Sequence, residues 1–354
     1  MRLTHEQTTT ESLAGVPRSR QCADRITGGA QRAADPFVNF QQLRSVRETV
    51  RCGFNLTDVA LSLHTSQPGV SRQIRELEDE LGLEIFVRAG KRLTGLTAPG
   101  EALLPIVERL LVEADNLKRA GDDFAHQGRG TLRIAATHSQ ARYALPPPVR
   151  DFRTAHPRVA LHMHQGSPHQ IAQMLIDGSA DVGIATEALA QYDELVALPC
   201  CSWTHVVVMP PGHELAALST AGALTLQHLA RHPIVTYESG YTGRSHIDQA
   251  FAKAGLVPDV VLQAMDADVI KTYVELGLGV GIVAAIAFDE SRDAHLHAID
   301  ARHLFAANMT RLAVRRGAYL RDYVYEFIAG FAPPLTKALV QRALESPAGT
   351  DFGL

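Results

Sequence analysis

Apolar residues recur at helical spacing in three short runs near the N-terminus. The first run begins at Phe40, and the second opens at Asn55, a residue type that often caps helices. The third opens at Ser66 and carries Pro68 in its first turn, where a missing backbone N–H is tolerated. Three short helices with such brief connections have the dimensions of a helix-turn-helix, whose last helix enters the DNA major groove.

The polar face of the third predicted helix divides by charge. Amide, hydroxyl and basic groups occupy its N-terminal half, and carboxylates such as Glu76 and Glu80 follow. The N-terminal part of a recognition helix contacts base edges and phosphates, so this division favours DNA binding. A turn at residues 90–92, between two strand-like runs, adds a wing with basic side chains for the phosphate backbone. The residues predicted to contact DNA are Ser66, Gln67, Pro68, Ser71, Arg72, Arg75, Arg88, Lys91 and Arg92.

A long helix is predicted over residues 97–127, because Thr97 caps a run in which apolar residues alternate by four and three positions. Such a heptad seam favours pairing with a second copy of the chain. The alternative is that the helix packs on its own domain. The members of the repeat are Leu103, Val107, Leu110, Ala114 and Leu117.

From residue 131 onward the pattern changes to strands that alternate with helices. Repeated β-α-β units imply parallel sheets, and two such runs imply two lobes with a cleft between them. The predicted fold class is α/β, with an N-terminal winged helix-turn-helix, a linker helix and a two-lobed α/β effector domain. The predicted segments are a disordered extension at 1–37, a DNA-binding domain at 38–96, a linker helix at 97–127, an effector domain at 128–340 and a loose tail at 341–354.

Composition and charge add little to this picture. The chain has 354 residues, of which 46% are hydrophobic, and its net charge of −4 does not by itself indicate a nucleic-acid partner. It has no run of roughly 20 apolar residues and no apolar signal core near its start, so we expect a cytoplasmic protein without membrane contact. The four cysteines lack the spacing of a zinc site or a disulfide scaffold, and a redox role for Cys200 or Cys201 is the alternative to a structural one.

Two segments resemble the DNA-binding domain of the LysR-type regulators, namely residues 39–43 (NFQQL) and 66–78 (SQPGVSRQIRELE). Other segments resemble the CysB subfamily, which controls sulfur assimilation and cysteine biosynthesis. These segments are residues 136–146 (ATHSQARYALP), 162–168 (HMHQGSP), 242–245 (TGRS) and 266–273 (DADVIKTY). The resemblance begins near Val38, which stands where the family has its initiator methionine, and the first 37 residues have no counterpart in it.

The resemblance implies the partners and the mode of action. A CysB-like protein binds double-stranded promoter DNA as a homo-tetramer, a dimer of dimers, and acts with RNA polymerase. Its effector domain is like that of the periplasmic binding proteins and takes a small anion, which is sulfate, thiosulfate, N-acetylserine or O-acetylserine. The resemblance implies no cofactor and no enzymatic activity. Related regulators of sulfonate or taurine utilisation share these motifs and supply the alternative function.

Hydroxyl and amide side chains cluster on loops that each connect a predicted strand to a helix. Such loops present backbone N–H groups and the positive end of a helix dipole, which suits a small anion. The same residue types commonly cap helices, which is the alternative interpretation from the residues alone. The resemblance favours the effector site, although Ser139 stands where the family usually has threonine. The predicted effector-binding residues are Thr137, His138, Ser139, Gln140, Ser167, Trp203 and Thr242.

Metal binding and catalysis find little support in the sequence. His162 and His164 face the same side of a predicted strand, as do His295 and His297, but spacing places no third ligand beside either pair. The chain has no nucleotide-binding glycine loop, no nucleophile elbow and no paired carboxylates at a defensible spacing. We therefore expect neither a metal site nor an enzyme. A solute-binding protein would explain the two lobes but not the helix-turn-helix, the wing or the heptad helix.

Overall fold

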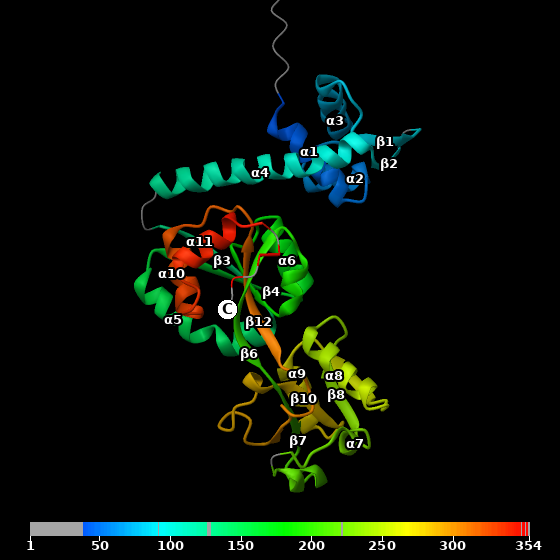
Figure 1. Cartoon of the computed structure of the whole chain (residues 1–354), viewed down its shortest axis with the longest axis vertical. Coiled ribbons are helices and arrows are strands. Elements are labelled where there is room, and N and C mark those ends of the chain that lie inside the picture. The colour runs from blue at the N-terminus through cyan, green and yellow to red at the C-terminus, as the bar shows by residue number, and fades with distance from the viewer. Residues whose placement is uncertain are drawn as a thin grey trace, which may run out of the picture. The chain divides into compact units, whose positions relative to one another are not determined.

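A computed structural model describes residues 38–90, 92–125, 129–220, 222–347, 349–350 and 352, with the backbone alone at Thr242. The predicted disordered extension at 1–37 lies outside the described residues. The chain divides into one compact unit that ends at Glu101 and a second that begins at Ala102. Figure 1 labels most of the helices and strands of the two units.

The first unit is the predicted three-helix domain. It contains α1 (Phe40–Arg51), α2 (Leu56–Ser62) and α3 (Gln67–Leu81). Side chains at the expected caps bond to the first turns, since Asn55 Oδ1 accepts from Thr57 N at 3.1 Å and Ser66 Oγ accepts from Gly69 N at 3.3 Å. The three helices bury one face each, and these faces form the core of the unit. Its fully buried aliphatic residues include Val46, Val59, Val70, Ile74 and Leu77.

The wing is a two-stranded antiparallel hairpin, β1 (Phe86–Ala89) with β2 (Arg92–Leu96). Phe86, fully buried, anchors its first strand in the core of the unit. The sequence-based prediction of a winged helix-turn-helix is therefore confirmed.

The long helix α4 spans Ala98–Ala125, and Thr97 Oγ1 accepts from Gly100 N at 3.0 Å at its start, as predicted. The predicted heptad seam needs a correction, because Val107 is buried within the chain itself. An apolar stripe nevertheless remains exposed along α4, where residues spaced by four and seven face solvent. This α4 stripe consists of Ile106, Leu110, Leu117 and Phe124.

The C-terminal half of α4 packs on the effector domain through polar groups. Asn116 Nδ2 donates to Gly317 O at 2.7 Å, and Asn116 Oδ1 accepts from Tyr319 N at 2.8 Å. Arg119 Nη1 lies 2.5 Å from Asp181 Oδ1, a carboxylate that also accepts from a backbone amide of the first strand of the domain. These contacts join the helix to the first lobe without using the α4 stripe.

The effector domain has two lobes, each built on a five-stranded sheet. In lobe I, α5, α10 and α11 cover one face of the sheet and α6 the other (Figure 1). Lobe I, in sheet order, contains β4 (Val159–Gln165), β3 (Gly130–Ala136), β5 (Val182–Ala185), β12 (Asn308–Arg315) and β6 (Leu195–Trp203), with α5 (Pro146–Ala155), α6 (Pro168–Ile176), α10 (Asp322–Phe331) and α11 (Lys337–Glu345).

Lobe II is formed by the segment of chain between β6 and β12, the two strands of lobe I that precede and follow it. Two apolar clusters, one on either face, form its core. In sheet order it contains β11 (His297–Asp300), β7 (His205–Met209), β10 (Val280–Ala284), β8 (Pro233–Tyr237) and β9 (Asp259–Ala264), with α7 (Leu226–Leu229), α8 (Thr242–Lys253) and α9 (Ala267–Glu275).

The expectation of parallel sheets is only partly right, because both sheets are mixed. In lobe I, β12 runs antiparallel to β5 and β6, and in lobe II, β7 runs antiparallel to β10 and β11. The chain leaves lobe I through β6, enters lobe II at β7 and returns as β12. A strand that returns from the other lobe has no crossover helix, so it can join the sheet in the opposite direction.

The predicted loose tail at 341–354 also needs a correction. Residues 341–345 complete α11, because Val340, Ala343 and Leu344 are buried against the lobe I core. Farther along, Phe352 packs against the same core. None of the helices in the described residues is both long and apolar enough to cross a membrane.

Candidate functional site

The first candidate surface lies on α3 and the wing. A hollow beside the recognition helix is lined by six of the nine residues that the sequence predicts to contact DNA. Ser66 is used as the N-cap of α3, Arg92 is exposed on β2, and Lys91 lies outside the described residues. The six lining residues are Gln67, Pro68, Ser71, Arg72, Arg75 and Arg88.

The arginines of α3 project into solvent and are held by their own helix. The side chain of Arg72 is 81% exposed, and its Nε lies 2.7 Å from Glu76 Oε1, one turn later. Arg75 Nη2 donates to Ser71 Oγ at 3.2 Å. An exposed pair of this kind contributes little to stability, so these arginines can exchange their partners for phosphates or base edges.

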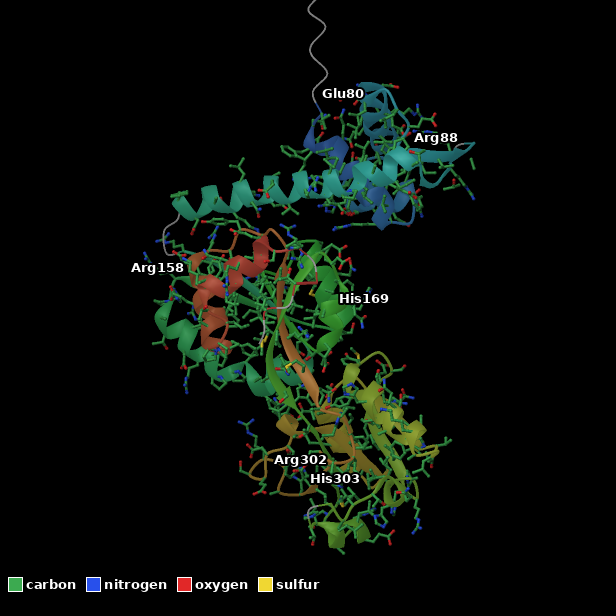
Figure 2. All side chains as sticks on the ribbon, viewed as in Figure 1. Glu80, Arg88, Arg158, His169, Arg302 and His303 are labelled. Atoms are coloured by element: carbon green, nitrogen blue, oxygen red, sulfur yellow. The ribbon has the colours of Figure 1, made fainter. Side chains whose placement is uncertain are left out.

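Arg88 differs from the other predicted contacts because its guanidinium is already engaged. Arg88 Nη2 lies 2.5 Å from Glu78 Oε2, and the position of Arg88 on the wing is shown in Figure 2. Glu78 is buried, and its Oε1 accepts from Ile85 N at 2.9 Å and from Phe86 N at 3.2 Å. Glu78 therefore connects the wing to the recognition helix. The sequence did not reveal this role, because Glu78 is one of several acidic residues in the same stretch.

The second candidate site is a small pocket between lobe I and lobe II. Its walls come from the loop after β3, the end of β6, the start of α8 and the ends of β8 and β10. The space open to the centre of a water molecule is about 40 Å³, which is room for a few water-sized groups. The lining residues are Thr137, His138, Ser139, Gln140, Thr186, Trp203, Tyr237, Tyr241, Gly243, Met265, Ala284 and Ile286.

Five of the seven residues predicted to bind effector line this pocket, namely Thr137, His138, Ser139, Gln140 and Trp203. Ser167 does not line it. Its hydroxyl caps α6 and accepts from Gln170 N at 3.3 Å, which is the alternative that the sequence left open. Thr242 is the first residue of α8, and its side chain lies outside the described part of the chain.

The remaining wall residues were not found from the sequence. Gly243 follows Thr242 in α8, and a Cβ atom there would lie 3.0 Å from the ring of Trp203. A larger residue at this position would therefore have to displace the tryptophan ring by a few tenths of an ångström. Thr186, Tyr237 and Met265 come from three other segments, and only the assembled fold brings them to the pocket.

Buried polar groups at the pocket lack partners among the described residues. Trp203 Nε1 is a buried donor without a hydrogen bond. Gln140 Nε2 donates to Thr310 Oγ1 at 3.0 Å, which leaves the amide oxygen of Gln140 unpaired. Turning that amide over lets the Thr310 hydroxyl donate and frees the Gln140 NH₂ group for the pocket. A ligand that accepts hydrogen bonds would satisfy both residues.

The donors around the pocket are neutral. Burial raises the pKa of Tyr237 to about 12, so its hydroxyl remains protonated. None of the lining residues is a lysine or arginine. Arg244, the nearest arginine in the motif, is turned away: its Nη1 donates to Tyr237 O at 2.7 Å and its Nε lies 2.7 Å from Asp248.

His138 lines the pocket, but other protein groups hold its ring nitrogens. Nδ1 lies 3.2 Å from Gln165 Oε1, and Nε2 lies 2.9 Å from Asp268 Oδ2. Within the described residues, His138 also forms a group of possible metal ligands with Asp266 and Asp268. Asp268 additionally lies 2.8 Å from the Arg142 guanidinium, which already compensates its charge. The cluster is therefore better explained as a protein network than as a metal site.

The adjacent cysteines of β6 differ in environment. Cys200 is largely buried, and burial raises the pKa of its thiol to about 12, whereas Cys201 is exposed. Because the thiolate is the reactive form, Cys200 is poorly suited to the redox role considered as an alternative.

Comparison with known proteins agrees with this architecture. Residues 40–101 match the family model of the bacterial regulatory helix-turn-helix protein, lysR family, and residues 125–332 match the LysR substrate binding domain. The HTH-type transcriptional regulator SsuR of Burkholderia cenocepacia is 58% identical over 87% of this chain and 99% of its own length. The HTH-type transcriptional regulator CysB of the same organism is 53% identical over 88% of this chain and 98% of its own length.

A solved structure supports the same assignment. The cofactor-binding domain of the Cbl transcriptional regulator is 45% identical, with a TM-score of 0.59, over 62% of this chain and 96% of that domain. These findings confirm the resemblance to CysB-type regulators that the motifs predict, and regulators of this type bind DNA and small-molecule effectors. The chain belongs to the LysR family of helix-turn-helix transcriptional regulators.

Proposed function

We propose that this chain regulates genes of sulfur assimilation and cysteine biosynthesis, and that a small anion in the inter-lobe pocket controls its action on promoter DNA. It acts in the cytoplasm by binding and not by catalysis. The observation that carries the proposal is the unpartnered Trp203 Nε1 donor, buried in a pocket whose other donors are neutral. Buried polar groups are normally paired, so this donor is available to an acceptor group of an effector bound in the pocket.

The size and the chemistry of the pocket favour sulfate or thiosulfate. Space for a few water-sized groups accommodates a compact ion, and neutral donors hold an anion by hydrogen bonds alone. N-acetylserine and O-acetylserine are the larger candidates and require the lobes to move apart. Binding held in this way is weak and reversible, which suits a sensor of a metabolite pool.

The effector acts by favouring one arrangement of the two lobes. A ligand shifts such an equilibrium only by its different affinities for the two states. Lobe I is bonded to α4 through Asn116 and Arg119, so a change in lobe I reaches the helix directly.

Two exposed apolar surfaces support assembly into a dimer of dimers. The α4 stripe is one of them, and its heptad spacing suits pairing with a second copy. Val269 and Tyr273 on α9, with Leu276 at its C-cap, form a second exposed stripe in lobe II, and the two contacts together give a tetramer. Bound in this form at promoter DNA, the protein contacts RNA polymerase.

Regulation of sulfonate or taurine utilisation is the second candidate function. It uses the same pocket and the same DNA-binding surface. The relative SsuR, at 58% identity, matches this chain at least as well as CysB, at 53%, so both groups of promoters belong in the test.

The test measures promoter binding by the full-length protein. Fluorescence anisotropy would compare DNA from upstream of sulfate-reduction genes with DNA from upstream of sulfonate-transport genes, each with sulfate, thiosulfate or N-acetylserine. Sodium chloride at matched ionic strength is the control, because salt alone weakens DNA binding. We expect at least one of the three ligands to change the affinity for the first promoter group. Preference for the second group would support the sulfonate function, and indifference to every ligand would contradict the effector site.

A further inference from the structure

Two of the motif segments meet across the cleft at Asp268, beside the pocket but outside its lining. Asp268 lies in the first turn of α9 in lobe II. Its Oδ1 accepts from Tyr143 Oη at 2.6 Å, and its Oδ2 lies 2.9 Å from His138 Nε2 and 2.8 Å from Arg142 Nε. Three donors of lobe I therefore converge on one carboxylate of lobe II.

Lys271 fixes the lobe II side of this network. Its ammonium group is buried, 2.9 Å from Asp293 Oδ1 and 2.9 Å from Ala287 O, so it is held within lobe II. The same ammonium donates to Tyr143 Oη at 3.1 Å. The ring of Tyr143 packs against the apolar cluster of lobe II, although Tyr143 belongs to lobe I.

The environment keeps Asp268 ionised. Burial acts to raise the pKa of Asp268, but the hydrogen bonds from Tyr143 and His138 outweigh it. The positive charges of Lys271 and Arg142 add to this effect, and the pKa is lowered overall. Charge-assisted hydrogen bonds are the stronger kind, so the carboxylate stabilises the closed arrangement of the lobes.

The network and the effector pocket share one turn of chain. Residues 137–140 line the pocket, and the turn η1 (Gln140–Ala144) carries Arg142 and Tyr143 to Asp268. From lobe II, Met265 lines the pocket three residues before Asp268. Closing the lobes therefore completes both arrangements at once.

We propose that Asp268 is a positioning residue that latches the two lobes together around the effector and so sets effector affinity without touching the effector. The proposal rests on the proposed function of the pocket as the effector site. Each lobe has an apolar core of its own, so the network is not needed for either lobe to fold. Its contribution falls on the equilibrium between open and closed lobes.

The first test replaces Asp268 by asparagine in the full-length protein. Asp268→Asn keeps the shape but removes the charge and turns an NH₂ group toward lobe I donors. Calorimetry should show the dissociation constants of sulfate and thiosulfate, the ions that fit the closed pocket, rising by a similar factor, about tenfold, because a latch acts on closure and not on selectivity. The matched control is Glu275→Gln, on the same helix, whose partner His295 also belongs to lobe II. That variant should bind as the parent does.

The second test observes the pocket without an effector. Trp203 is the single tryptophan of the chain and lines the pocket, so its fluorescence reports the state of the cleft. Emission of Asp268→Asn should shift to longer wavelength, and saturating sulfate should restore the parental spectrum. Tyr143→Phe removes one donor and should act in the same direction, and the double variant should show less than the sum of the two effects.

Some results would overturn the latch. The first is that both single variants bind the ligands with the affinity of the parent and show the emission spectrum of the parent. The second is an emission shift that sulfate does not reverse, because such a shift would indicate a purely structural role for the network. If the parent protein binds none of the three ligands, the proposed function is wrong. The comparison of tryptophan emission between the parent and Asp268→Asn without effector still tests whether Asp268 holds the lobes together.

Discussion

The DNA-binding unit and the effector unit present their functional side chains in opposite ways. The predicted DNA contacts that the structure describes lie on α3, its N-cap and the adjoining hairpin, and most are exposed, as the 81% exposed side chain of Arg72 illustrates. The effector pocket gathers buried side chains from both lobes, among them Thr137 at 8% and Gln140 at 5% exposure. Exposed polar groups can bond to water until DNA replaces it and need no partner from elsewhere in the chain. The local sequence is therefore enough to predict where they lie. A buried polar site depends on which distant segments supply its partners.

This difference predicts how substitutions divide between stability and binding. Exposed residues of α3 should affect DNA affinity alone, whereas buried groups should affect the free energy of unfolding or the affinity for effector. Glu78 tests this expectation, because it is a buried residue of the DNA-binding unit, in which the predicted contacts are mostly exposed.

The largest expected effect is that of Glu78→Ala. The substitution leaves two backbone amides and the Arg88 guanidinium without their acceptor, and we expect unfolding to become easier by about 3 kcal/mol. Urea denaturation measures it. The control is Glu76→Ala, which removes an exposed carboxylate of the same helix and should change stability by less than about 0.5 kcal/mol. Equal effects of the two variants would contradict the bracing role of Glu78.

A second substitution, Trp203→Phe, should separate binding from stability. It deletes a buried donor that has no partner among the described residues, so the effector-free protein should lose little stability. Binding of an anion should weaken by about 1.5 to 3 kcal/mol, since a charged acceptor loses a hydrogen bond. Calorimetry with sulfate measures the loss, and Tyr273→Phe, outside the pocket, is the control. Unchanged sulfate affinity would remove Trp203 from the effector site.

For the DNA-binding surface, Arg72→Ala should reduce specific promoter affinity by about 1 to 3 kcal/mol if the arginine contacts a base edge. Stability should stay the same, because the only contact described for this side chain is an exposed pair with Glu76. Anisotropy with a specific and a scrambled DNA separates base contacts from phosphate contacts. An equal loss on both sequences would reassign Arg72 to the phosphate backbone.

The smallest expected effect concerns pH and the buried ring of His205. Burial and then the charge of His246 lower the pKa of His205 to about 4. The unfolded chain therefore takes up the proton first, and stability is lost as the pH falls from about 6.5 toward 4, by about 1.5 kcal/mol between pH 8 and pH 5.5. His205→Phe should remove this part of the pH dependence, and the exposed His164→Gln should leave it. Urea denaturation at the two pH values compares them.

Short-range signals along the chain determined where many elements begin. Side-chain caps at Asn55, Ser66 and Thr97 begin α2, α3 and α4 where the sequence predicts, because a capping bond needs only residues within one turn. The β-α-β alternation located most strands of both lobes. It gave no sign of β6 and β12, which carry the chain out of lobe I and back, or of β11 in lobe II, because each of these strands pairs with a segment far away in the sequence.

The sequence by itself determined the family, the helix-turn-helix and most of the loop that carries Thr137 to Gln140, since these depend on contiguous motifs. Tertiary structure decided which of the candidate hydroxyl groups reach the pocket, and it assigned Ser167 to a helix cap instead. It also decided that Arg88 is bound to Glu78 and that Asp268 collects donors from the opposite lobe. The physical reason is that hydrogen bonds and ion pairs act over about 3 Å in space, whatever the separation along the chain.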